Sequence, residues 1–294
     1  MSADTESPVA ARLPGMERVV AVLGRGLVPA DTPILRADDL GALRGDGVFE
    51  TLHVRSGVPW LLDQHLARMA RSAARLDLAL PSREDLAALA GEACAAWPAE
   101  LEGAQRLVCT RGPEDGGPVT CYATIAPIAP AVVQARQQGV RVATATLGFT
   151  ADVRGPAPWL LGGVKSLSYA VNMASLRWAE TQGCEDVLWL STDGYALEAP
   201  TSTLLWLTGA ELWTVPTTTG ILPGTTARYL LDHADDLGFR AGERLIRPAE
   251  LETADAVWLT SSVRGVIPVV QLDGVKLATS PYTEQIRTLL GYPA

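Results

Sequence analysis

The chain has 294 residues and a formal net charge of -9 at pH 7, and 48% of its residues are hydrophobic. This length exceeds what one hydrophobic core usually serves, so we expect a folded protein with two domains. The acidic balance opposes binding to nucleic-acid phosphates and to anionic membranes, which argues against both as nonspecific partners. It leaves room for a local basic pocket that binds an anionic small-molecule substrate.

The N-terminal segment and the cysteines indicate a cytoplasmic protein. Residues 1–7 lack the basic region and apolar core of a secretory signal, and no uninterrupted apolar stretch is long enough to span a bilayer. Cys94, Cys109, Cys121 and Cys184 are scattered without CxxC spacing. That scatter argues against a zinc site and is typical of buried thiols in a reducing compartment, so we expect no metal.

The first half of the chain alternates strand and helix patterns. Strands are predicted over residues 17–23, 48–54, 106–110 and 120–125. Apolar residues recur at helical spacing from Leu62 to Leu76, and an alanine-rich helix is predicted over residues 84–97. Prolines at 127 and 130 interrupt regular pairing, which places a linker at residues 129–138 between an N-terminal domain, 1–128, and a C-terminal domain, 139–294.

The second half repeats the mixture. Strands are predicted over residues 140–146, 186–191, 195–198, 203–208, 211–215 and 256–259, and helices over 168–181, 225–237 and 283–290. The coarse prediction is therefore two mixed α/β domains. Neither a GxGxxG after a first strand nor a GxxxxGK[ST] occurs, which argues against a dinucleotide fold and a P-loop.

Lys165 is the most informative residue, because it lies among small and apolar neighbours just before a helical pattern. Burial lowers the pKa of a lysine, and a neutral amine is the nucleophile of Schiff-base chemistry. The structural alternative for a single lysine of this kind is packing of its stem against apolar surface, with the ammonium in water. The neighbouring motifs decide between the two interpretations.

Those motifs occur in a recognisable order. The run 45–51 (GDGVFET) precedes Lys165, and the runs 197–203 (LEAPTST) and 220–226 (GILPGTT) follow it. Taken in order, the series resembles the fold-type IV pyridoxal-phosphate (PLP) enzymes, which include branched-chain aminotransferases, D-amino acid aminotransferases and aminodeoxychorismate lyases. The resemblance covers most of the chain. It implies PLP as the cofactor, a two-domain mixed α/β (α+β) fold like that of D-amino acid aminotransferase, and a homodimer.

The resemblance assigns the cofactor ring to two residues. Lys165 resembles the family's Schiff-base lysine, which can also move protons once a substrate amine has displaced it. Glu198 resembles the carboxylate that keeps the pyridine nitrogen protonated, so that the ring acts as an electron sink. Taken alone, Glu198 would be interpreted as a solvated residue at the end of a strand.

The cofactor phosphate is assigned to three further segments. Thr225 and Thr226 precede a helical pattern, where free backbone N–H groups and the helix dipole attract an anion, although threonine also caps ordinary helices. Ser262 follows an apolar strand and resembles a second phosphate loop. Arg68, in the run HLARM, matches the phosphate-binding arginine, and its structural alternative is a solvent-facing helix residue.

The reaction is predicted from the residues that are expected to contact the substrate. Arg111 resembles the arginine with which some members hold a substrate carboxylate, and Arg106 is the weaker candidate. Thr51 matches a threonine that aminodeoxychorismate lyases carry, where it can assist proton transfer. The leading hypothesis is therefore conversion of 4-amino-4-deoxychorismate to 4-aminobenzoate and pyruvate. The alternatives are a transaminase acting on D-amino or branched-chain amino acids, and a catalytically silent binding protein.

Three positions depart from the commoner family pattern, and each removes a polar arm from the expected site. Ser168 replaces an asparagine, Thr203 replaces another asparagine, and Ala227 replaces an arginine. Tyr169 is interpreted as a helix-face residue that could instead bond the cofactor hydroxyl.

Overall fold

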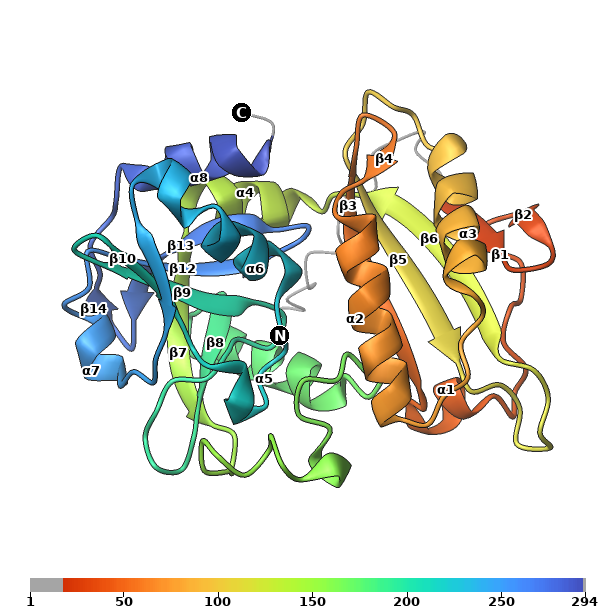
Figure 1. Cartoon of the computed structure of the whole chain (residues 1–294), viewed down its shortest axis with the longest axis horizontal. Helices are drawn as coiled ribbons and strands as arrows, with labels where there is room; N and C mark the ends of the chain where they lie inside the picture. The colour runs from red at the N-terminus through yellow and green to blue at the C-terminus, as the bar shows by residue number, and fades with distance from the viewer. Residues whose placement is uncertain (1–17, 293–294) are drawn as a thin grey trace, which may run out of the picture.

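The computed structural model describes residues 18–292. Met1–Ser7, for which no secretory signal is expected, and Glu17, at the start of the first predicted strand, lie outside the described residues. The chain forms two curled sheets side by side, as Figure 1 shows. None of the helices formed by residues 18–292 combines the length and the apolar character needed to cross a bilayer.

The first sheet has six strands in the order β2-β1-β6-β5-β3-β4. Its strands are β1 (Val19–Val22), β2 (Gly26–Val28), β3 (Gly47–Arg55), β4 (Val58–Pro59), β5 (Gly103–Thr110) and β6 (Thr120–Pro127). Helices α2 (Leu62–Arg75) and α3 (Arg83–Ala95) cover one face, and α1 (Leu40–Arg44) precedes β3. Side chains alternate between the two faces of a strand, so Leu52 and Leu107 pack under the helices in a shared core.

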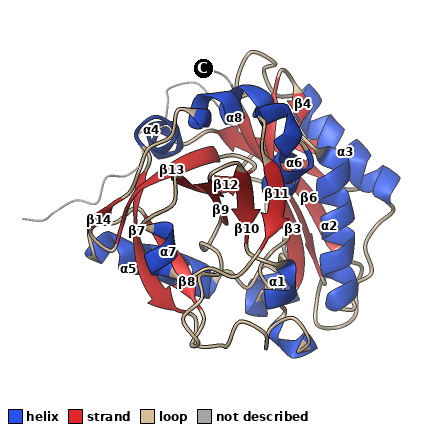
Figure 2. Cartoon of the chain, turned by 60° about the vertical axis from the view of Figure 1, so that its left-hand side comes forward, coloured by secondary structure: helices blue, strands red, loops and turns tan. Residues whose placement is uncertain are grey.

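The second sheet has eight strands and carries the longer C-terminal part. The main path runs β11-β10-β9-β12-β13-β7-β8, and β14 pairs with β13. Its strands are β7 (Val140–Thr146), β8 (Asp186–Leu190), β9 (Thr203–Thr208), β10 (Glu211–Thr214), β11 (Arg240–Glu243), β12 (Ala256–Ser261), β13 (Gly265–Leu272) and β14 (Val275–Lys276). Figure 2 shows the curl of these strands. The core packed against them contains the fully buried Trp206.

Five helices accompany the second sheet. They are α4 (Pro130–Gln138), α5 (Ala170–Thr181), α6 (Thr225–Asp232), α7 (Pro248–Leu251) and α8 (Tyr282–Leu290). The segment expected to be a linker is thus largely the helix α4, which begins with Pro130, a residue whose fixed φ suits the first helical turn. We propose that the two sheets, with α4 between them, are the two domains.

Three expectations need correction. Residues 195–198 do not form a regular strand, because the Ala196 N–H donates to the Ile246 carbonyl and leaves only an isolated bridge to Leu190. The helix predicted over 225–237 ends at Asp232 and gives way to a 3-10 turn, Ala234–Leu237. Cys109 and Cys121 are not free thiols but form a disulfide, because β5 and β6 pair them directly at a Cα–Cα distance of 4.3 Å.

Candidate functional site

Lys165 lies where the two sheets meet, on a segment that pairs with the free edge of β3. The Phe49 N–H donates to the Lys165 carbonyl at 3.1 Å, and the Leu167 N–H donates to the Gly47 carbonyl at 2.9 Å. The Lys165 N–H in turn donates to Ser72 Oγ on α2 at 3.1 Å. These three hydrogen bonds fix the lysine against β3 and α2 although it belongs to the C-terminal part of the chain.

The Lys165 side chain is buried among aromatic rings. Its Nζ lies 3.3 Å from the Tyr169 hydroxyl and 4.5 Å from the centroid of the Phe49 ring. Burial lowers the pKa of Lys165 to about 8, and the positive charge of Arg68 acts in the same direction. A sizeable fraction of the amine is therefore neutral near pH 8, which is the form that attacks a carbonyl carbon.

Glu198 is a buried carboxyl group with two neighbours. Its Oε2 accepts from the Leu222 N–H at 3.0 Å, and its Oε1 lies 3.8 Å from Arg154 Nη1. Burial raises the pKa of Glu198 to about 7 in spite of both neighbours. Arg154 Nη1 makes no hydrogen bond to any described residue. A protonated ring nitrogen placed here would stabilise the carboxylate, and the carboxylate would in turn keep that nitrogen protonated.

Arg68 and Glu50 form a buried ion pair below the site. Arg68 Nε donates to Glu50 Oε1 at 2.8 Å, and Nη2 donates to Oε2 at 2.5 Å. Burial alone would raise the pKa of Glu50, but the charge and the hydrogen bonds of Arg68 outweigh it, and the pKa falls to about 2. Arg68 Nη1 also donates to the Pro223 carbonyl at 3.0 Å, which connects α2 to the turn before α6.

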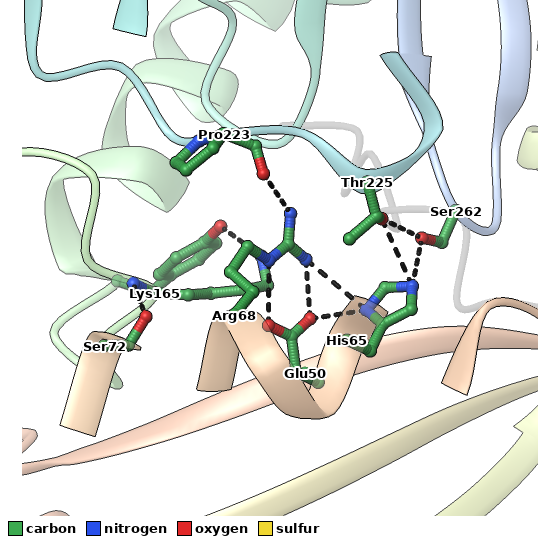
Figure 3. Close-up of polar contacts among 9 residues, drawn as sticks. Glu50, His65, Arg68, Ser72, Lys165, Pro223, Thr225 and Ser262 are labelled. Carbon is green, nitrogen blue, oxygen red and sulfur yellow. Dashed lines mark hydrogen bonds and ion pairs between the residues drawn. The ribbon is translucent and has the colours of Figure 1, made fainter. Parts of the chain in front are cut away.

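His65 links the same ion pair to two hydroxyl groups. Its Nδ1 lies 2.6 Å from Glu50 Oε2, and its Nε2 lies 2.9 Å from Ser262 Oγ and 3.2 Å from Thr225 Oγ1 (Figure 3). The two hydroxyls are 3.3 Å apart. Thr225 is the first residue of α6, and Ser262 follows β12. Two segments of the C-terminal part of the chain therefore meet at the His65 ring, which belongs to α2.

This convergence has the donor set of a phosphate site. The hydroxyls of Thr225 and Ser262 lie together at the N-terminus of α6, where backbone N–H groups are free to bind an anion. Thr226 Oγ1 is buried and finds no hydrogen-bond partner among residues 18–292. A bound phosphate oxygen would satisfy that hydroxyl, so the residues fit a phosphorylated cofactor.

Tyr292, near the C-terminus, fixes the backbone of the loop that carries Ser262. The Tyr292 hydroxyl donates to the Ser262 carbonyl, and its ring stacks on His53 with centroids 4.9 Å apart. His53 Nε2 also lies 2.5 Å from Glu102. His53 is thus a buried structural residue. His233 lies with its Nδ1 at 2.8 Å from the Tyr229 carbonyl.

The two candidate substrate arginines differ in their surroundings. Arg111 Nε donates to Asp46 at 2.8 Å, and its Nη atoms donate to the carbonyls of Asp77 and Leu76. Its guanidinium therefore already braces the loop after α2. Arg106 is exposed and lies opposite Thr51 in the β3–β5 pairing, so the two side chains share one sheet face. That face also carries Phe49, whose ring contacts Lys165.

The three unusual positions lie in different places. Ser168 Oγ bonds the backbone carbonyl of Gly45 at 3.3 Å. Thr203 and Ala227 line a cavity of about 470 Å³ that also touches Gly224 and Thr225 and extends towards the exposed side of α2. Lys165 and Glu198 are not among its lining residues, so this cavity lies beside the phosphate turn and is separate from the lysine.

The sequence assigned no role to three residues of the cluster: Glu50, His65 and Arg154. Two of them had a signal. Glu50 is the one charged residue on a strand face that otherwise carries Val48, Leu52 and Val54, and a charge on such a buried face must find a partner. His65 lies three residues before Arg68, on the same face of a helix.

Within residues 18–292 there is no group of three or more His, Cys, Asp and Glu side chains that could hold a metal ion.

Comparisons with known proteins agree with this geometry. Residues 47–272 match the protein family described as Amino-transferase class IV. The chain is 41% identical over 281 residues to a bifunctional aminodeoxychorismate lyase / D-amino acid transaminase of Mycobacterium tuberculosis, covering 92% of this chain and 97% of that protein. It is 29% identical to a D-alanine aminotransferase of Bacillus licheniformis, covering 86% and 89% of the two chains.

A solved structure shares the fold. A hypothetical aminotransferase from Mycobacterium tuberculosis, in its PLP-bound form, superimposes with a TM-score of 0.90 at 40% identity, covering 94% of this chain and 98% of that chain. The mixed α/β fold expected from the sequence is confirmed, and so is PLP as the cofactor.

Proposed function

Because the chain belongs to the class IV aminotransferase family of PLP-dependent enzymes, we propose that it acts as a 4-amino-4-deoxychorismate lyase forming 4-aminobenzoate and pyruvate. The observation that carries the proposal is the buried, low-pKa Lys165 on a sheet face shared with Thr51 and Arg106. The lyase name of the relative that is 41% identical supports it.

The cofactor would be held at both ends. Lys165 would anchor it covalently, Glu198 would face its ring nitrogen, and its phosphate would lie between the hydroxyls of Thr225, Thr226 and Ser262. Arg68 would face the phosphate from α2 with the guanidinium hydrogens that Glu50 and Pro223 leave unused. When bound, PLP supplies an electron sink for charge that develops at the carbon bearing the substrate amino group.

Lys165 would move the protons of the reaction. Once the substrate amine has displaced it, Lys165 as a neutral amine would remove the proton from C4 of the substrate, the C3–O bond would break, and the ring would become aromatic. The departing enolpyruvate takes a proton at its methylene carbon and becomes pyruvate. Lys165 would deliver that proton, and Thr51, on the same sheet face as Phe49, would assist.

Arg106 is the better candidate for holding a substrate carboxylate. Its guanidinium is exposed and contributes to lowering the pKa of Lys165, which places its charge near the reacting amine. Arg111 is committed to Asp46 and two backbone carbonyls and would act by positioning the adjoining loop. The ranking drawn from the sequence is therefore reversed in the proposal.

Transamination of D-amino acids is the second candidate, because the same relative carries a transaminase name and the D-alanine aminotransferase is also similar. Branched-chain amino acids are the alternative substrates. Both reactions use the same cofactor residues and differ after proton removal. On one PLP-loaded preparation, the lyase predicts 4-aminobenzoate and pyruvate from authentic substrate, and the transaminase predicts conversion of PLP to pyridoxamine phosphate by an amino acid. Formation of neither aromatic product nor pyruvate would exclude the lyase.

A homodimer belongs to the same proposal. Helices α2 and α3 cover one face of the first sheet, while Arg106, Tyr122 and Thr124 lie half-buried or exposed on the other face. A second copy would bury this face next to the substrate side of Lys165. Light scattering at a twofold mass would support the dimer, and a monomer that is active at micromolar concentration would oppose it.

A further inference from the structure

His65 is bonded on both sides of its ring, and one side has a defined proton. Nδ1 faces Glu50 Oε2 at 2.6 Å, and the bidentate pairing with Arg68 keeps Glu50 ionised. An ionised carboxylate can only accept a hydrogen bond. Nδ1 of His65 therefore carries a hydrogen in every state of the ring, and only Nε2 can change.

The state of Nε2 determines how the two hydroxyls are used. In the neutral ring Nε2 is an acceptor, so Ser262 or Thr225 donates its single hydrogen to it (Figure 3). At most one hydroxyl then remains to donate elsewhere. In the protonated ring Nε2 donates to the hydroxyl oxygens, and both hydroxyl hydrogens become free to bind an anion.

The charges around His65 favour the protonated ring once an anion is present. The charged groups that face it are Glu50 from β3, Arg68 from α2, and Lys165 from the segment before α5. Burial lowers the pKa of His65 in the free protein, and Arg68 and Lys165 act against protonation while Glu50 favours it. A phosphate ester adds about 1.5 to 2 negative charges at pH 7 and only accepts hydrogen bonds.

We propose that binding of the cofactor phosphate between Thr225 and Ser262 is coupled to uptake of one proton at Nε2 of His65. The inference rests on the proposed cofactor site and deepens it. His65 is then a positioning residue: the proton that it gains turns two hydroxyls from donors to its own ring into donors to the phosphate. Glu50 holds the ring in place through Nδ1, and the bound phosphate offsets the new charge.

Calorimetry can count the proton. The probe is pyridoxine 5'-phosphate, which has no aldehyde and so cannot react with Lys165, titrated at pH 7.5 in buffers of different ionisation enthalpy. Wild-type protein is expected to take up close to one proton more per bound ligand than His65→Gln, because the glutamine amide donates to the hydroxyls without gaining a proton. As pH rises, wild-type affinity should fall relative to the variant by up to about tenfold per pH unit. Equal uptake in both proteins would overturn the inference.

A second measurement does not depend on the variant being folded. The chain contains three histidines, so ¹⁵N-histidine labelling gives three rings to follow in the intact wild-type protein. The His65 Nε2 resonance should move from the range of an accepting ring nitrogen to that of a protonated one when pyridoxine 5'-phosphate binds. No movement with bound ligand, or no binding at all, would refute the coupling. Product assays with PLP test the proposed reaction separately, so failure of either can be recognised.

Discussion

Replacing Glu50 by glutamine tests whether the buried ion pair beneath the cofactor site stabilises the fold. Glutamine keeps the shape of the side chain but loses the charge, and its amide group turns a donor towards Arg68 or His65, which are themselves donors. The charge of Arg68, whose side chain is only 5% exposed, would then lie uncompensated in the interior. Removing one partner of a buried pair is more harmful than replacing both.

The magnitude follows from the pKa of Glu50. Lowering it from 4.5 to about 2 corresponds to about 3 kcal/mol of stabilisation at neutral pH. Because the folded-state pKa is depressed, this stabilisation is complete above pH 4.5 and is lost as pH falls towards 2. Breaking a buried ion pair costs about 3 to 5 kcal/mol in other proteins, which agrees with this figure.

Denaturant unfolding at pH 7, followed by circular dichroism, should show Glu50→Gln less stable than wild type by about 3 to 5 kcal/mol. At pH 3 the difference should be smaller by about 2 kcal/mol, because part of the stabilisation by ionised Glu50 is lost there. The matched control is Glu185→Gln, which breaks a surface pair with Arg141 and should cost less than about 1 kcal/mol. Combining Glu50→Gln with Arg68→Met should cost less than the sum of the two. A loss no larger than that of Glu185→Gln would refute the reasoning.

Three further outcomes are expected. The rate of covalent attachment of PLP to Lys165 should rise with pH and level off above about 8, because only the neutral amine reacts. The adduct can be trapped with borohydride and measured by mass spectrometry. A rate that does not change from pH 6 to 9 would contradict this. Tyr292→Phe removes the donor to the Ser262 carbonyl and should weaken PLP affinity about five- to tenfold in a spectroscopic titration, with unchanged affinity as the opposing result. Arg106→Met should raise KM for substrate about tenfold or more, whereas Arg111→Met should mainly lower the melting temperature; the reverse pattern would restore the sequence-based ranking.

Helices and strands could be predicted where the hydrophobic pattern ends at residues that favour a turn. Residues 140–146 and 203–208 form β7 and β9 at their predicted bounds, because β-branched and apolar residues end there at polar or glycine-containing turns. Residues 195–198 have a similar composition, yet they lie irregularly because their hydrogen bonds go to Ile246 and to β8 in turn. A local sequence pattern does not show which distant carbonyl groups will accept these backbone hydrogen bonds.

The candidate site could be predicted in its order but not in its contacts. The motif series pointed to Lys165, Glu198 and Thr225, and the structure brings all three to the region between the sheets. Arg154 could not have been found, since no local feature distinguishes an arginine that meets Glu198 only through the folding of a loop. Arg111 illustrates the opposite error, because its residue type suits a carboxylate while its actual partners already occupy it.

The pairing of Arg68 with Glu50 changes how the phosphate site must work. A guanidinium has five hydrogens, and Glu50 and the Pro223 carbonyl accept three of them, so Arg68 meets a phosphate with two hydrogens and with its charge already neutralised. The attraction for a dianion must therefore come from elsewhere. The free N–H groups of α6 supply part of it, and two hydroxyls freed by a protonated His65 would supply the rest. Arg68 therefore mainly fixes the turn at Pro223. The positive charge that attracts the phosphate is the one that His65 gains when its ring is protonated.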